Sequence, residues 1–225
     1  GGGPVNANNI DNASRFWRLG EAVREKTLGR LLGVNSRRYW DRRFQKNWEA
    51  RNGSLQTALF AVGMLSVSDL ISIQSLVDFG CALGDSLPVI HRFYPHIDLK
   101  YFDASPVAMR TTQHKYQSIA QPMGQDDIVD VVYCSNVIEH LAETEPVLQE
   151  IDRHAAKMII IQAPYMETKY GQYLTPSEST GEHVRTVDEK YLRQLFHYEC
   201  SIVTYSIPYA RTPGLREQVV ATYRK

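Results

Sequence analysis

The sequence lacks the features of secreted, membrane-spanning and nucleic-acid-binding proteins. Its three cysteines among 225 residues are scattered, which gives neither a disulfide framework nor metal-ligand spacing. There is no secretory signal and no apolar run of about eighteen residues, so no transmembrane helix is expected. The formal net charge is zero, whereas nucleic-acid-binding proteins usually carry an excess of basic charge. We therefore expect a cytoplasmic protein with no nucleic-acid partner and no stable membrane insertion.

The sequence also lacks the G-x-G-x-x-G fingerprint of dinucleotide-binding turns. In its place, an apolar run over 73–79 ends in a G-x-x-x-G turn from Gly80 to Gly84, followed by Asp85. A pyrophosphate needs backbone N–H groups at a helix N-terminus, and the Asp85 carboxylate would repel it. The turn therefore disfavours a nicotinamide dinucleotide and favours an adenosine-containing cofactor without phosphate. S-adenosylmethionine has this chemistry.

A second short strand supports an adenosine site. The run 97–102 is followed by Asp103, about twenty residues after the glycine turn, where an acidic side chain can accept hydrogen bonds from both ribose hydroxyls. The alternative is that Asp103 only caps the next helix. Its spacing from Gly80 favours the ribose role.

Apolar patterning predicts the organisation of the whole chain. The sequence is 43% apolar, enough for one domain with a substantial core. We expect residues 1–10 to be disordered or a tag remnant, and 11–69 to form a helical extension that acts as a lid or acceptor platform. Residues 70–225 alternate strands and helices, which predicts an α/β core with a doubly wound, mostly parallel sheet. Seven strands are expected (six if the third is vestigial), the last one antiparallel. The helices and strands of this core are predicted at 73–79, 85–94, 97–102, 106–118, 128–134, 144–154, 157–162, 187–197, 199–206 and 217–224.

Five motifs in this order resemble the class I (Rossmann-like) S-adenosylmethionine-dependent methyltransferases. They are residues 77–84 (VDFGCALG), 101–105 (YFDAS), 130–141 (DVVYCSNVIEHL), 159–165 (IIIQAPY) and 183–187 (HVRTV). Ala82 stands where the first motif usually has its middle glycine. The resemblance implies methyl transfer from S-adenosylmethionine, with S-adenosylhomocysteine as the second product.

The resemblance, together with the strand ends, also predicts the site residues. Asp78 is expected to hold the turn by accepting backbone N–H groups. Cofactor contacts are predicted at Asp78, Gly80, Cys81, Ala82, Gly84, Asp103, Ala104, Ser105, Cys134, Ser135, Asn136 and Gln56. Acceptor contacts are predicted at Tyr165, Glu139, Tyr39 and Trp40.

Two histidines are candidates for proton transfer. The unperturbed pKa of histidine, about 6.5, suits a base that takes the proton of a hydroxyl acceptor. His140 and His183 are therefore predicted as catalytic; the alternative is that Glu139 and His140 only pack the start of a helix. Together with Glu139 they offer three metal-binding groups, but two are adjacent and no spacing supports a metal site, so none is predicted.

The favoured activity is methyl transfer by direct displacement to a small-molecule or sugar-type acceptor, such as a glycan, through a hydroxyl group. A place in bacterial biosynthesis is expected by analogy. Two alternatives stay open. One is a non-catalytic relative that serves as a binding or partner subunit, since Ala82 departs from the motif. The other, less favoured, is an NAD-dependent oxidoreductase.

Overall fold

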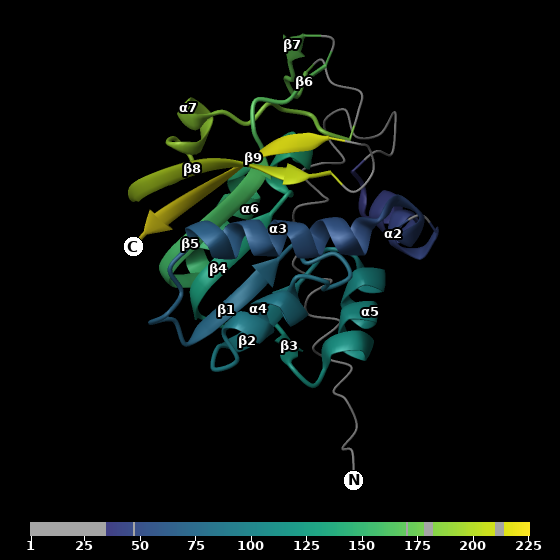
Figure 1. The fold of residues 1–225 in the computed structure, drawn as a ribbon, viewed down its shortest axis with the longest axis vertical. Helices are drawn as coiled ribbons and strands as arrows, with labels where there is room; N and C mark the ends of the chain where they lie inside the picture. Colours follow the sequence, from purple (N-terminus) through teal and green to yellow (C-terminus); the bar gives the residue numbers. More distant parts are fainter. Residues whose placement is uncertain (1–34, 47, 170, 178–181, 210–213) are drawn as a thin grey trace.

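A twisted sheet of seven strands forms the centre of the described part of the molecule (Figure 1). The computed structural model describes residues 35–46, 48–169, 171–177, 182–209 and 214–225. The expected disordered start, 1–10, and the part of the predicted helical extension before residue 35 lie outside these residues. The strand order is β3-β2-β1-β4-β5-β9-β8. The strands are β1 (Ser75–Phe79), β2 (Asp98–Phe102), β3 (Ala120–Pro122), β4 (Val129–Ser135), β5 (Ala155–Pro164), β8 (Glu199–Pro208) and β9 (Leu215–Arg224).

The direction of the strands agrees with the predicted topology. β3, β2, β1, β4 and β5 pair in parallel, whereas β9 runs antiparallel to both β5 and β8. The loop between β8 and β9 is too short for a crossover helix, so these strands form the expected antiparallel hairpin. The order reverses beside β1, and the carboxyl ends of strands at such a switch point are where open α/β sheets bind ligands.

Helices cover both faces of the sheet because its central strands are apolar on both sides. Leu76 and Tyr133 face one core with α3 (Gly53–Val67), α4 (Leu87–Phe93) and α5 (Pro106–Tyr116). Val77 and Ile159 face the opposite core with α6 (Glu145–His154) and α7 (Glu189–Leu192). In Figure 1, α3 crosses in front of the sheet. No helix in the described residues is both long and apolar enough to cross a bilayer.

The helical extension reaches the carboxyl edge of the sheet. α2 (Arg37–Lys46) begins after Ser36, whose hydroxyl accepts the Tyr39 N–H at 3.2 Å, as expected of a helix cap. A 3₁₀ turn, η1 (Glu49–Arg51), leads into α3. Phe44 of α2 packs in a small cluster with Ala82 and Ala108. α2 is thereby placed against the glycine turn and the start of α5.

The seventh expected strand, β3, is present and has only three residues. Two other features differ from the prediction. The hairpin of β6 (Thr168–Lys169) and β7 (Gln172–Tyr173) has no counterpart in the sequence prediction. The helix predicted over 187–197 covers only Glu189–Leu192. After it, the Leu192 carbonyl accepts the Leu195 N–H at 3.1 Å, in a tighter turn, and the Tyr223 hydroxyl at 2.6 Å.

Candidate active site

The glycine turn after β1 is tightly enclosed. Gly80 and Gly84 have φ of 89° and 77°, which side chains rarely allow. A Cβ on Gly80 would overlap Val137 Cγ2, and one on Gly84 would lie 2.5 Å from Thr112 Cγ2. Ala82, in the middle, has φ of 51°, so it accepts a left-handed conformation that glycine would adopt without strain. Within the turn, the Cys81 and Leu83 side chains are buried in the neighbouring hydrophobic clusters.

Asp103 ties this turn to the end of β2. One carboxylate oxygen accepts the Ala82 N–H at 2.9 Å and the other accepts the Ser105 N–H at 2.8 Å. A carboxylate has about four acceptor positions, so this leaves capacity for two ribose hydroxyls. The cap of α5 is Ser105, whose hydroxyl accepts the Ala108 N–H at 3.1 Å. The alternative role of Asp103 as helix cap is therefore already filled by another residue.

Asp78 is buried beneath the turn and supports it differently from the prediction. The hydroxyl of Ser86 donates to its carboxylate, in place of the expected backbone N–H groups. Burial raises the pKa of Asp78 to about 7, against the opposing effect of the Ser86 hydrogen bond. Burial also raises the pKa of Asp103 to about 7, and the nearby Asp78 charge adds to this effect although two backbone N–H groups oppose it. Two carboxyl groups with raised pKa therefore lie under and beside the turn.

The end of β4 places the next group of predicted residues. Cys134 is fully buried in the core, and Cys81 in the glycine turn is nearly so. Ser135 and Asn136 are half-buried, and Asn136 has φ of 53° while its N–H donates to the Gln162 carbonyl at 2.8 Å. This bend directs the chain into a 3₁₀ turn, η2 (Ile138–His140), which carries Glu139 and His140.

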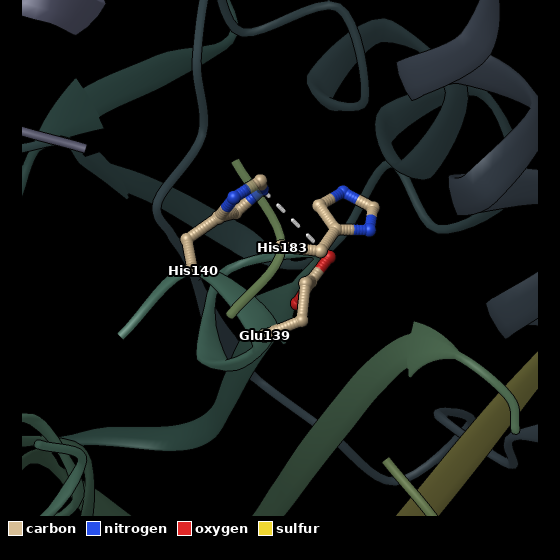
Figure 2. Close-up of side chains that lie close together, drawn as sticks. All are labelled: Glu139, His140 and His183. Carbon is tan, nitrogen blue, oxygen red and sulfur yellow. Dashed lines mark ion pairs between the residues drawn. The ribbon is translucent and has the colours of Figure 1, made fainter. Parts of the chain in front are cut away.

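Glu139, His140 and His183 converge although they come from two separate segments (Figure 2). One ligand atom from each lies within 4.8 Å of the others. The Val184 N–H donates to the Glu139 carbonyl at 2.8 Å, which fixes the His183 segment against η2. His140 and His183 rings meet edge to face, 4.8 Å between centroids. Burial raises the pKa of Glu139 to about 7, although the His183 charge opposes this shift.

Both imidazoles are held through Nδ1. Nδ1 of His140 lies 2.9 Å from the Glu182 carbonyl oxygen, and Nδ1 of His183 is hydrogen-bonded to the Glu167 carboxylate. Burial lowers the pKa of His183, but the Glu167 hydrogen bond and the Glu139 charge outweigh it and the net shift is upward. Nε2 of His140 is 3.9 Å from a Glu139 oxygen. The rings are therefore oriented by partners outside the cluster.

α2 connects the two halves of the site. Trp40 meets His140 edge to face at 5.0 Å, and the Ser105 hydroxyl donates to Asp41. The Tyr39 hydroxyl and Arg43 both bond Glu182. α2 thus touches the segment after Asp103 on one side and the histidines on the other.

The remaining predicted residues lie on α3, after β5 and after β2. Gln56 is buried on α3, Tyr165 is half-buried just after β5, and Ala104 is half-buried between Asp103 and Ser105. Glu167 and Glu182 were not predicted from the sequence, although Glu167 bonds His183 and Glu182 bonds His140 and α2. No local sequence pattern indicates either residue, because the side chains that each one bonds lie far from it in the sequence.

Comparison with known proteins agrees with the topology and the glycine turn, which together define a methyltransferase fold. Residues 32–198 match the family of methyltransferase domains. A SAM-dependent methyltransferase from Aquifex aeolicus has 14% identity, coverage of 80% of this chain and 98% of its own, and a TM-score of 0.55. Magnesium protoporphyrin IX methyltransferase from Synechocystis, with bound S-adenosylhomocysteine, has 16% identity, 77% and 83% coverage, and a TM-score of 0.51.

A chain of the Haloferax volcanii complex that contains the Trm112 methyltransferase activator has 14% identity, 82% and 96% coverage, and a TM-score of 0.63. None of the curated proteins matches the sequence significantly. The match to the family covers most of the chain, and the chain therefore belongs to the methyltransferase domain family. The family match and the fold together confirm the prediction of a class I, S-adenosylmethionine-dependent methyltransferase.

The residues present fit this cofactor. Asp103 is half-buried beside the turn and keeps acceptor capacity for two ribose hydroxyls after it has bonded the Ala82 and Ser105 N–H groups. S-adenosylmethionine supplies a methyl group activated on a sulfonium ion.

Proposed function

We propose that this enzyme methylates a hydroxyl group of a small-molecule or glycan acceptor. The observation that carries the proposal is the convergence of Glu139, His140 and His183 next to the glycine turn. The cluster and the turn are close together, because the side chain of Val137, two residues before Glu139, lies directly against Gly80. A hydroxyl is a poor nucleophile until it loses its proton, and this cluster can receive one. One of the proteins of this fold acts on magnesium protoporphyrin IX, a small molecule.

The proposed reaction is a direct displacement. The acceptor oxygen forms a bond to the methyl carbon as the carbon–sulfur bond breaks, and the electron pair of that bond stays on sulfur. The hydroxyl proton passes to the imidazole of His140 or His183. Glu167 holds Nδ1 of His183 and stabilises the ring when it is protonated, as a carboxylate does for a catalytic histidine. Positioning of the reactants provides most of the remaining rate enhancement.

We assign the cofactor to the turn and the two adjacent strand ends. Asp103 accepts hydrogen bonds from the ribose, and Asp78 supports the turn from below. The other proposed contacts are Gly80, Cys81, Ala82, Gly84, Ala104, Ser105, Cys134, Ser135, Asn136 and Gln56. The acceptor is assigned to Glu139, Tyr39, Trp40 and Tyr165.

We further propose that residues 11–69 act as a lid or acceptor platform on the methyltransferase core, 70–225. The support is α2, which contacts both Ser105 and His140 through consecutive residues. The cysteine usage and the zero net charge favour a cytoplasmic setting with no nucleic-acid partner. A place in bacterial biosynthesis is proposed by analogy.

Calorimetric titration with S-adenosylmethionine, S-adenosylhomocysteine and NAD tests the cofactor site. We expect Kd values on the order of 1–100 μM for the first two and no binding of NAD. Asp103→Ala removes hydrogen bonds to a charged group, so binding is expected to weaken by roughly 10–100-fold. Asp98→Ala, at the exposed opposite end of β2, is the matched control. Unchanged affinity in Asp103→Ala contradicts the assignment.

Release of S-adenosylhomocysteine then tests the acceptor. We would compare a panel of hydroxylated small molecules and sugars with peptides and RNA. We expect turnover with hydroxylated small molecules or sugars, and we expect this turnover to fall in His183→Gln. Turnover only with peptide or RNA contradicts the proposed acceptor class, and cofactor binding without turnover of any acceptor favours the partner-subunit alternative.

A further inference from the structure

The cluster of Glu139, His140 and His183 has a property that proton transfer alone does not explain. Glu139 is 1% exposed, and neither carboxylate oxygen has a hydrogen-bond partner among the described residues. A buried carboxylate without hydrogen bonds is costly, because desolvation is not compensated. The side chain points at the two imidazoles, as Figure 2 shows. Its environment is therefore incomplete unless a cation lies between these groups.

The two histidines are oriented as metal ligands usually are. A metal-binding imidazole commonly donates its other ring N–H to a carboxylate or a backbone carbonyl. Here Nδ1 of His183 is bonded to Glu167, and Nδ1 of His140 is 2.9 Å from the Glu182 carbonyl oxygen. These bonds define Nε2 as the nitrogen of each ring that a metal would take. Nε2 of His140 already lies 3.9 Å from the Glu139 carboxylate.

We propose that Glu139, His140 and His183 bind one divalent transition-metal ion, with one carboxylate and two imidazoles as protein ligands. The ligand atoms lie within 4.8 Å of one another, so small side-chain movements bring all three to a shared ion. Two imidazoles favour zinc, iron, cobalt or nickel over manganese, magnesium and calcium, which prefer oxygen ligands. Three protein ligands leave open coordination positions, as in catalytic sites.

The metal gives the cluster a defined role in the proposed function. An acceptor hydroxyl bound at an open position would have a lowered pKa and would lose its proton near neutral pH. In the metal-loaded protein the two histidines act as ligands in place of the bases described above, and the hydroxyl proton passes to solvent water. This use of the metal rests on the proposed methylation of a hydroxyl group, but the metal site itself does not, so the two are tested separately.

Metal binding is tested on the full chain without any acceptor. The protein is stripped with a chelator, then titrated with Zn²⁺ and Mg²⁺ by calorimetry and with Co²⁺ by visible absorption. We expect one equivalent of Zn²⁺ to bind with a Kd on the order of 1 μM or tighter, Mg²⁺ to bind at least 100-fold more weakly, and Co²⁺ to give d–d bands of a four- or five-coordinate site. Absence of stoichiometric Zn²⁺ and Co²⁺ binding overturns the proposal.

Matched variants locate the ion. Glu139→Gln and His183→Gln are expected to weaken Zn²⁺ binding by more than tenfold, and Glu167→Gln by about 10–100-fold through His183. The controls are Glu143→Gln and His114→Gln, which change exposed residues of the same types. Wild-type affinity in both Glu139→Gln and His183→Gln overturns the proposal and indicates surface binding. If His183→Gln does not fold, Glu139→Gln decides, because it removes a buried charge and is expected to fold.

The test of the metal site can fail or succeed independently of the test of the proposed function. S-adenosylhomocysteine binding depends on the turn and Asp103, and is expected to be equal in stripped and metal-loaded protein. If stripping abolishes turnover of a hydroxyl acceptor and Zn²⁺ or Co²⁺ restores it, both the metal site and the proposed function are supported. Stoichiometric metal binding without turnover of hydroxyl acceptors supports the site and contradicts the acceptor class. Full turnover by stripped protein that binds no metal overturns the metal site and leaves the histidines as bases.

Discussion

Replacing Asp78 with asparagine is expected to change the pH dependence of stability in a calculable way. Asp78 is 2% exposed, and its pKa rises from 3.8 to about 7 in the folded protein. The folded state therefore binds a proton that the unfolded state has lost at intermediate pH. The stability from this proton is fully present below pH 3.8 and is lost as pH rises through about 7. The amide side chain of Asp78→Asn has no such proton to lose, so the variant lacks this decline.

The magnitude follows from the width of that pH interval. At about 1.36 kcal/mol per pH unit, the wild type loses roughly 3 kcal/mol from this group between pH 5 and pH 7 to 8. The amide oxygen of asparagine can still accept the Ser86 hydroxyl, so the supporting hydrogen bond is retained. We therefore expect Asp78→Asn to become more stable relative to wild type by roughly 3 kcal/mol over this range.

Urea unfolding of both proteins from pH 5 to pH 8.5 measures the effect. Only the change in their difference with pH is used, because Asp103 titrates in both proteins. Asp78→Asn also removes a charge that raises the pKa of Asp103, so the decline caused by Asp103 is smaller in the variant and adds to the expected difference in the same direction. Asp98→Asn, an exposed carboxylate on β2, is the matched control and should run parallel to wild type. A difference between Asp78→Asn and wild type that stays constant within about 0.5 kcal/mol across the range would refute the reasoning.

Three further predictions concern the turn and α2. Gly80→Ala should cost about 1–3 kcal/mol, because φ is 89° and the new Cβ overlaps Val137; urea unfolding measures this, and failure of Val137→Ala to recover part of it contradicts the overlap. Ala82→Gly should relieve the strain of φ 51° and strengthen S-adenosylhomocysteine binding in calorimetry, whereas weaker binding would show that the methyl group contributes. Arg43→Met removes the ion pair with half-buried Glu182, so α2 amides should exchange hydrogen faster while β1 amides do not. Equal protection in α2 would show that apolar packing alone holds it.

Relations within short segments were predictable from the sequence. The apolar run before Gly80, the acidic residue after the second strand and the order of the motifs defined the fold class and the cofactor. These signals are local, because a strand, its turn and the following helix are encoded by adjacent residues. Ser36 as the cap of α2 is a similar case, since its hydroxyl bonds a backbone N–H three residues away.

Only the tertiary structure decided how distant segments meet. Glu139 and His140 are neighbours in sequence, but a backbone bond from Val184 to Glu139 brings His183 to them, and Glu167 then orients its ring. The helix predicted over 187–197 is only four residues long, and the Tyr223 hydroxyl, on the last strand, donates to the carbonyl at its end. Such contacts depend on which elements pack together, and neither spacing nor periodicity records that choice. The sequence by itself therefore determined the methyltransferase class, whereas the convergence of one buried carboxylate and two oriented imidazoles came only from the folded chain.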